Sequence, residues 1–443
     1  MTTSGAIPTR CLRWLASSPS KRSSAIRLKS RGTAATPCPL LQVEEEVEED
    51  MKYDFDEPVR RRGTNCVKWD VCAEGVLPLW VADMDFRAAP AIVEALRRRA
   101  EEGVYGYALP PAAWHESLAK WLAARHGWNI LPEWAVDSTG VLPTLGAVLR
   151  ACCEPGDKVV LQAPAYNGFF PVIASQGCEI SWSPLRRVPA RSGMKGDFTY
   201  EMDFEDLERK VADPRAKVFL ISNPHNPAGR AWTAEELRKA GEICRRNGVL
   251  VASDEIHADL QMPGSKHVPF ALAGDWKPGE FVTFWSATKA FNLAGLHAAV
   301  ALCPDRDFRE RVRAAQEVGG SGHLNAFGFV ASATAWDCCA DWLDELRAYL
   351  FGNYEAMIAF LHERMPAVKC TTLEATYLAW LDVSAFGLPS GELARRLEDE
   401  ARVKLSPGSI YAEPKGGAFM RVNLASPRTM LMEALERVAS WLP

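Results

Sequence analysis

The sequence predicts an α/β protein with a mostly parallel sheet in a large domain, accompanied by a smaller α+β domain. From about residue 134, short apolar runs alternate with segments of helical periodicity, which is the pattern of parallel strands covered by helices on both faces. From about residue 330 the pattern changes to long amphipathic helices and a pair of strand-like segments. A length of 443 residues is sufficient for two cores of this kind.

Strands of the main sheet are expected where buried-type apolar runs end at polar or small residues. These runs are KVVLQAP (158–164), AKVFLISNP (216–224), GVLVASDE (248–255) and GEFVTFWSA (279–287). Between them, TAEELRKAGEICRRNG (233–248) begins with an N-cap threonine, carries acids in its first turn and ends at a glycine, which predicts a helix. Ligands of such sheets bind beyond the carboxyl ends of the strands, so we expect the functional site at that edge.

The smaller domain is expected to combine two distant parts of the chain. Residues 342–365 have the periodicity of a long amphipathic helix, and TYLAWLDV (376–383) and AFMRVNLA (418–425) have the alternation of a strand pair. The domain boundaries that we expect are 51–90 for the N-terminal part of the small domain, 91–330 for the large domain and 331–443 for the C-terminal part of the small domain.

Residues 1–50 differ in composition from the rest of the chain. All charged residues in 1–43 are basic, Ser, Thr and Ala are frequent, and the acidic run EEEVEED follows. This composition resembles an organelle transit peptide. The alternative that we favour is a disordered extension or translated upstream sequence, because a segment of globular composition begins at Met51. We therefore expect a cytoplasmic protein, or an organellar one if residues 1–43 are a transit peptide.

Composition excludes several classes of function. The chain has 51 basic and 56 acidic residues and a net charge of −5, which gives no electrostatic basis for nucleic-acid binding. No apolar run reaches the length of a membrane span. The twelve cysteines form no C-x-x-C pair, so we expect reduced thiols and neither a metal site nor a disulfide framework.

Glycine-containing or polar clusters follow several of the expected strands. They are DSTGVLPTLGAVLRACC (137–153), APAYNGFF (163–170), SNPHNPAGR (222–230) and VASDEIHADL (251–260). Gly140 precedes a helix whose first N–H groups could bind phosphate, Tyr166 could stack on a flat ligand, and Asp254 ends a buried run where a carboxylate needs a partner. Each cluster alone is better explained by a turn or by packing than by a function, and their combination in this order is much more specific.

Lys289 completes the combination. It follows the apolar run that ends at Trp285, a place where burying an ammonium group is costly unless something compensates. One ligand uses all of these features, because it has a phosphate, a flat ring, a ring nitrogen that needs an acid, a phenolic oxygen that needs a donor and an aldehyde that needs an amine. That ligand is pyridoxal 5'-phosphate, and the sequence therefore predicts it as the cofactor.

Six motifs relate the chain to a known family: LPLWVADMDF (77–86), GVYGY (103–107), PAYNGFF (164–170), SDEIHADL (253–260), KAFNLAGL (289–296) and TYLAWLDV (376–383). On these motifs, the segment from about 51 to 443 resembles the fold type I pyridoxal-phosphate enzymes of the class I and II aminotransferase family. Within that family it resembles the MalY/PatB-type cystathionine β-lyases, which are also called cysteine-S-conjugate β-lyases.

This resemblance implies a role for each candidate residue around the cofactor ring. Lys289 would bind the cofactor covalently and later take the Cα proton of the substrate. Asp254 would pair with the ring nitrogen, Asn226 and His257 would donate to the ring oxygen, and Tyr166 would stack on the ring face. For His257, packing without any contact to the cofactor remains the alternative.

The resemblance also implies the residues that hold the phosphate and the substrate. The phosphate would lie against Ser286 and the backbone of Gly140, Val141 and Leu142, while Tyr107 would reach it from the neighbouring subunit of a homodimer. Arg421 lies in an apolar strand and would clamp the substrate α-carboxylate; a domain-interface salt bridge is its structural alternative.

The eighth position after Lys289 departs from the wider family. Many aminotransferases have an arginine on the phosphate there, whereas this chain has His297, a weaker and pH-dependent cation. Members of the lyase subgroup also tend to lack that arginine.

The expected reaction is β-elimination of L-cystathionine or other cysteine S-conjugates to a thiol, pyruvate and ammonia. The first alternative is an aminotransferase that uses 2-oxoglutarate, and it would want a second cation for the distal carboxylate. A regulatory protein that acts by protein contact is the minor alternative, because some family members act on transcription factors. The expected partners are a small amino-acid substrate and a second copy of the chain, with no nucleic acid, membrane or metal.

Overall fold

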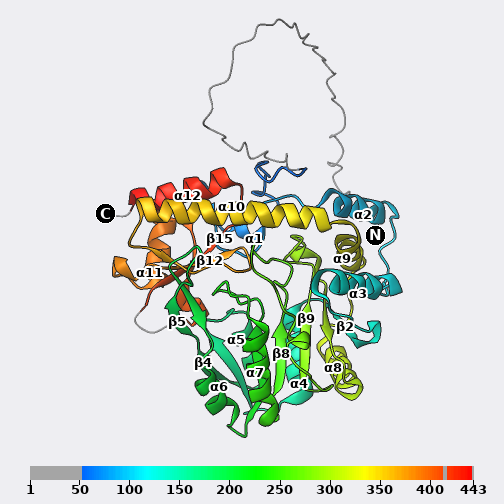
Figure 1. Ribbon diagram of the computed structural model, residues 1–443. Helices are drawn as coiled ribbons and strands as arrows, with labels where there is room; N and C mark the ends of the chain where they lie inside the picture. The colour runs from blue at the N-terminus through cyan, green and yellow to red at the C-terminus, as the bar shows by residue number, and fades with distance from the viewer. Residues whose placement is uncertain (1–51, 413–416, 442–443) are drawn as a thin grey trace, which may run out of the picture. The chain divides into compact units, whose positions relative to one another are not determined.

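The computed structural model describes residues 52–412 and 417–441 (Figure 1), so the predictions for residues 1–50 lie outside the described residues. The α-helices are α1 (Val67–Asp70), α2 (Pro90–Glu101), α3 (Ala112–His126), α4 (Val141–Cys152), α5 (Phe169–Ser175), α6 (Phe204–Val211), α7 (Ala234–Arg246), α8 (Arg306–Gly319), α9 (Ala326–Cys338), α10 (Ala340–Arg364), α11 (Ser390–Arg396) and α12 (Arg428–Trp441). The strands are β1 (Leu77–Pro78), β2 (Ala135–Ser138), β3 (Lys158–Ala163), β4 (Glu179–Pro184), β5 (Arg186–Pro189), β6 (Phe198–Glu201), β7 (Ala216–Ser222), β8 (Leu250–Asp254), β9 (Phe281–Trp285), β10 (Ala299–Leu302), β11 (Lys369–Cys370), β12 (Leu378–Asp382), β13 (Val403–Lys404), β14 (Ser406–Pro407) and β15 (Phe419–Asn423).

The main sheet confirms the predicted α/β class. In the described residues it has seven strands in the order β2-β10-β9-β8-β7-β3-β4. The neighbours from β9 to β4 pair in parallel, and β10 pairs antiparallel with both β9 and β2. All strands except β10 therefore end at the same edge, and β10 begins there.

Helices cover both faces of this sheet because successive strand residues point to opposite sides. On β3, Val159 and Leu161 join the apolar cluster that includes side chains of α4, α5 and α8, whereas Val160 between them joins the cluster that includes α6 and α7. Helix α7 begins at the predicted N-cap, Thr233, through a capping box with Glu236. Its C-cap is Asn247, one residue before the predicted glycine.

The C-terminal part of the chain forms a separate four-stranded sheet of order β11-β12-β15-β14. β12 and β15 form the predicted strand pair, and they pair antiparallel. Their residues are buried on both faces, so the expected alternation is wrong. In Figure 1, α10 and α12 lie side by side, and the two helices are in contact. Residues 51–443 form one compact unit, and the internal boundaries at 90 and 330 stay a prediction.

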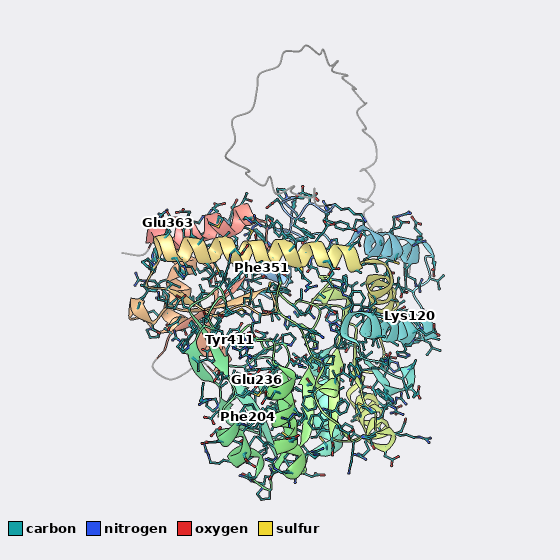
Figure 2. All side chains as sticks on the ribbon, in the orientation of Figure 1. Lys120, Phe204, Glu236, Phe351, Glu363 and Tyr411 are labelled. Carbon is teal, nitrogen blue, oxygen red and sulfur yellow. The ribbon has the colours of Figure 1, made fainter. Side chains whose placement is uncertain are left out.

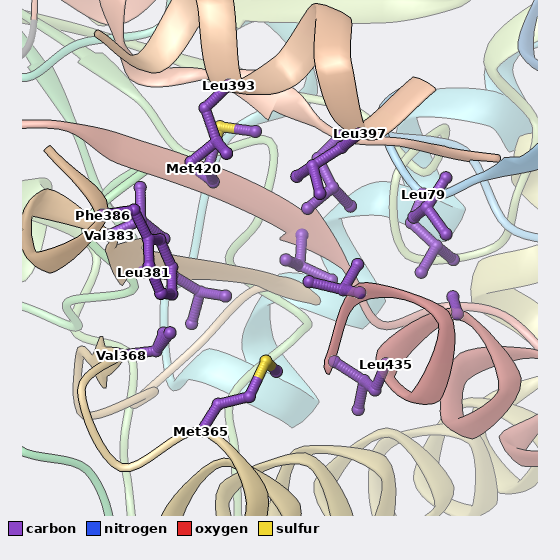
Figure 3. Close-up of a pocket in the computed structure, with 15 residues that line it drawn as sticks. Leu79, Met365, Val368, Leu381, Val383, Phe386, Leu393, Leu397, Met420 and Leu435 are labelled. Atoms are coloured by element: carbon purple, nitrogen blue, oxygen red, sulfur yellow. The ribbon is translucent and has the colours of Figure 1, made fainter. Parts of the chain in front are cut away.

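A small apolar cavity of about 30 Å³ lies within this C-terminal part (Figure 3). Its lining includes Leu381 and Val422 from the strands and Met365, Leu393 and Leu435 around the helices. A lining of apolar side chains offers no orienting group to a ligand, so we treat the cavity as a packing defect.

Among the described residues, no helix is both long and apolar enough to cross a membrane.

Candidate functional site

The edge where the main strands end carries a cavity of about 570 Å³. It lies where parallel α/β sheets bind ligands. Its lining includes residues that the sequence had singled out, namely Gly140, Val141, Leu142, Tyr166, Asn226, Asp254, His257, Lys289, His297 and Arg421. The fold thus brings these side chains together, while their individual roles stay predictions.

Lys289 lies in the turn that follows β9 and is partly buried. Its Nζ donates a hydrogen bond to the carbonyl oxygen of Ala82 at 2.8 Å. Burial, assisted by the positive charge of Arg421, lowers the pKa of Lys289 to about 8. At pH 7 about a tenth of the amine is therefore neutral, far more than for a solvated lysine, and the neutral amine is the form that attacks an aldehyde.

Asp254 is the last residue of β8, paired in register with Ser222 of β7 and Phe284 of β9. Its side chain is buried and accepts a hydrogen bond from the backbone N–H of Ile256 at 3.2 Å. Burial raises the pKa of Asp254 to about 7. A buried carboxylate of this kind is suited to accept a hydrogen bond from a protonated nitrogen of a ligand.

Two polar atoms in the cavity wall lack a hydrogen-bond partner among the described residues. They are Nδ1 of His257 and Nε of Arg421, and both side chains are buried. Burial, together with the charges of Lys289 and Arg421, lowers the pKa of His257 to about 3, so the imidazole is neutral. Buried polar atoms without partners are costly, and here they are available to a ligand.

Arg421 lies on β15 and is fixed by its neighbours. Its guanidinium donates to Oδ1 of Asn226 at 3.2 Å and to the carbonyl of Trp80 at 2.8 Å. It also lies 4.8 Å from the ring centre of Tyr411, which is labelled in Figure 2. Such a preorganised planar cation is suited to bind a carboxylate.

The N-terminus of α4 lines another part of the cavity, where it offers backbone N–H groups to a ligand. Gly140 is the N-cap, and Val141 and Leu142 begin the helix. The first N–H groups of a helix have no acceptor within it, and the helix dipole adds partial positive charge. This end of the cavity is therefore suited to an anionic group such as a phosphate.

Two of the predicted site residues do not line the cavity. Ser286 is buried behind it, where its hydroxyl donates to the carbonyl of Ala298 at 2.7 Å and lies 2.7 Å from the hydroxyl of Thr288. Thr288 does line the cavity. Tyr107 is fully exposed and lies outside the cavity lining, so its predicted role requires a second subunit.

The sequence analysis missed the role of residues 80–83, which we call the carbonyl segment. Six side chains donate to its consecutive backbone carbonyls. Ser406 binds Trp80 at 2.9 Å and Lys68 binds Asp83 at 3.3 Å. Arg421 binds Trp80, Asn423 binds Val81 and Asp83 at 2.6 Å each, and Lys289 and Tyr377 bind Ala82 at 2.8 and 3.0 Å. The segment lies within the LPLWVADMDF motif, but its contacts come from backbone atoms, which leave no residue-type signal.

Comparison with known proteins agrees with this geometry. Residues 74–438 match the family described as aminotransferase class I and II. The chain is 42% identical over 394 residues to cystathionine beta-lyase PatB of Bacillus subtilis, covering 88% of this chain and 100% of that protein.

Solved structures are similar as well. A pyridoxal-phosphate-bound putative aminotransferase from Clostridium difficile 630 has a TM-score of 0.83 at 36% identity, covering 88% of this chain and 100% of that one. A pyridoxal-phosphate-bound C–S lyase from Staphylococcus hominis has a TM-score of 0.80 at 29% identity, with coverages of 89% and 99%.

Proposed function

The chain belongs to the aminotransferase class I and II family, and from that premise we propose that it is a pyridoxal-phosphate-dependent carbon–sulfur lyase. It eliminates the thiol from L-cystathionine or another cysteine S-conjugate and releases pyruvate and ammonia. The names of its relatives support this reaction, because a cystathionine β-lyase and a C–S lyase are among them.

The residues of the cavity fit pyridoxal 5'-phosphate. The unpartnered Nδ1 of His257 fits the phenolic oxygen of the cofactor ring. The buried carboxylate of Asp254, whose pKa is raised, fits the protonated nitrogen of the same ring. The N-terminus of α4 matches a phosphate. When bound, the cofactor supplies an aldehyde for an amine and a ring that withdraws electrons from the substrate Cα.

The chain's own groups then hold the cofactor. Lys289 would form the covalent link, and Asp254 would keep the proton on the ring nitrogen. Asn226 and His257 would donate to the ring oxygen, and Tyr166 would stack on the ring. Val141 and its helix neighbours, with Ser286 acting through Thr288, would bind the phosphate.

Catalysis by the chain depends on proton movement at Lys289 and on substrate orientation by Arg421. The guanidinium binds the substrate α-carboxylate and so fixes which bonds at Cα and Cβ face the ring. The amine of Lys289 would take the Cα proton, and its lowered pKa makes the neutral form that can do so more populated than in a solvated lysine. The thiolate would leave with the electron pair of the Cβ–S bond, and one water would complete the hydrolysis to pyruvate and ammonia, so no keto acid is needed.

One observation carries the proposal: Lys289, which is partly buried, and Asp254, which is buried, line the same cavity at the carboxyl ends of neighbouring strands. The test is a product assay of purified protein with L-cystathionine and no keto acid. We expect pyruvate, ammonia and homocysteine in equal amounts, and no product from Lys289→Ala. Product formation that requires 2-oxoglutarate, with glutamate accumulating, would identify an aminotransferase instead.

We also propose a cytoplasmic homodimer in which Tyr107 completes the partner's site. Support comes from a run of exposed apolar side chains around it, since Val104, Tyr105 and Leu109 are 71%, 63% and 89% exposed. The described cysteines are free thiols, which is typical of a reducing compartment.

A further inference from the structure

Two carboxylate–histidine pairs lie buried outside the cavity, and the mechanism above does not use them. Glu255 pairs with Nε2 of His267 at 2.8 Å, and Asp259 pairs with Nε2 of His126 at 2.7 Å. The two imidazole rings meet edge to face, 5.3 Å apart. All four side chains are buried.

Glu255 is held by several donors at once. Oε1 accepts from the hydroxyl of Ser253 and from the backbone N–H of Phe270, both at 2.9 Å, and Oε2 accepts from His267. These three donors fix the position of the Glu255 carboxyl group. Burial lowers the pKa of His267, so this imidazole donates as a neutral group and does not cancel the charge.

The position of Glu255 in the chain links this charge to the site. It directly follows Asp254 at the end of β8, and the two side chains point to opposite sides, because Asp254 lines the cavity and Glu255 does not. The negative charge of Glu255 favours a proton at Asp254, while Lys289 acts in the opposite direction from the cavity. Interactions between charges are weakly screened in such a buried region.

We propose that Glu255 is a positioning residue of the site, whose charge strengthens the hold of Asp254 on the protonated ring nitrogen of the cofactor. This inference rests on the proposed function, because it needs pyridoxal phosphate in the cavity. Glu255 itself touches neither cofactor nor substrate. Asp259 carries the other buried carboxylate nearby, but it lies beyond His267 and is paired with His126 and Trp121.

The test uses two ligands and the full-length chain stripped of cofactor. One ligand is pyridoxal phosphate, and the other is its 1-deaza analogue, in which a C–H group replaces the ring nitrogen. Glu255→Gln removes the charge and keeps the shape, and its amide can still accept from Ser253 and Phe270. We expect it to weaken pyridoxal phosphate binding about tenfold, the equivalent of about one pKa unit, and to leave the analogue's dissociation constant unchanged.

The ratio of the two dissociation constants separates charge from structure. Glu255→Asp keeps the charge, so its ratio should lie close to that of the wild-type protein. Asp259→Asn should leave the ratio at the wild-type value. An equal loss for both ligands in Glu255→Gln would make Glu255 merely structural and overturn the inference, as would no loss for either.

A second variant tests the inference without altering Glu255. His267→Gln exchanges one neutral donor for another, so the ratio should stay at the wild-type value. A changed ratio in this variant would mean that His267 is charged and that the cluster carries no net field, which overturns the inference. Failure of the proposed function is distinguishable: without a cofactor site the wild-type chain would bind neither ligand, and a different reaction on the same cofactor would change the products and leave both dissociation constants as they are.

Discussion

At the scale of single residues, burial brings the pKa values of two ordinary side chains closer together. It lowers the pKa of Lys289 to about 8 and raises that of Asp254 to about 7. In water these two groups titrate more than six units apart on a typical scale. Both therefore change protonation close to neutral pH, which is what a site that transfers protons at that pH requires.

The titration of Lys289 predicts how the apoprotein captures its cofactor. Only the neutral amine attacks an aldehyde, so the rate of covalent capture of pyridoxal phosphate should rise with pH and level off above about 8. Stopped-flow absorbance of the apoprotein measures this rate. Arg421→Met should move the midpoint upward, because it removes a positive charge that disfavours the ammonium form. A rate that continues to rise toward pH 10.5 in wild type would contradict the prediction.

Asp254 should destabilise the folded apoprotein, although the proposed reaction needs its carboxylate. Its folded-state pKa lies above the unfolded value, so the folded state binds more protons between about pH 4 and 7 and stability falls as pH rises through that window. Asp254→Asn should therefore stabilise the apoprotein at pH 8, on the order of 2 kcal/mol, while reducing turnover about a hundredfold or more. Chemical denaturation and turnover measure the two effects.

Asp259→Asn is the matched control for that stability prediction. Asp259 accepts hydrogen bonds from His126 and Trp121, so its loss should not stabilise the apoprotein. Near-normal turnover of Asp254→Asn would show that another group handles the ring nitrogen.

Arg421→Lys should act mainly on substrate capture. A point charge replaces a planar fork that is already aligned by Asn226 and Trp80, so kcat/KM should fall about ten- to a hundredfold while the cofactor stays bound. Steady-state kinetics with L-cystathionine measures the loss, and Arg437→Lys on the surface of α12 serves as control. An unchanged kcat/KM would assign Arg421 to structure alone.

At the scale of elements, the sequence was sufficient to predict most strands of the main sheet and the candidate site residues that follow them. The runs that end at Asp254 and Trp285 are strands because their residues are apolar on both faces, and a parallel sheet makes their ends meet. The direction of β10 was not predictable, since apolar content carries no sign of parallel or antiparallel pairing. The carbonyl segment was missed for a related reason: its contacts use backbone atoms that every residue has.

The apolar cavity under β15 predicts a stabilising substitution. Val422→Ile adds one methylene group toward a space of about 30 Å³ and keeps a β-branched residue in a strand, so it should stabilise the protein by about 1 kcal/mol. Thermal or denaturant unfolding measures the change. Val300→Ile on β10 is the control, because that residue is fully buried without lining the cavity, and it should be neutral or destabilising. Equal effects of the two substitutions would contradict the cavity argument.

At the scale of the whole molecule, the proposed dimer makes a prediction that a single chain cannot satisfy. Tyr107 is fully exposed and lies outside the cavity that Lys289 lines, so the two belong to one site only if Tyr107 comes from the partner. Co-expressed chains carrying Tyr107→Ala and Lys289→Ala should recover part of the activity, because one of the two sites in a mixed dimer is intact. Isolation of mixed dimers through two different tags measures this. Mixed dimers without activity would place Tyr107 elsewhere.

The carbonyl segment also bears on how the protein is made. Its hydrogen bonds join Ala82 to Lys289 and Trp80 to Arg421, contacts that span 207 and 341 residues of sequence. The N-terminus of a chain leaves the ribosome first, so the carbonyl segment has no hydrogen-bond partners from β15 until nearly the whole polypeptide has emerged. A nascent chain that already displays Lys289 still lacks Arg421 and Asn423, and its site stays unassembled. We therefore expect cofactor capture to be a post-translational event, and translation products truncated before β15 to accumulate as chaperone clients and not as weakly active enzyme.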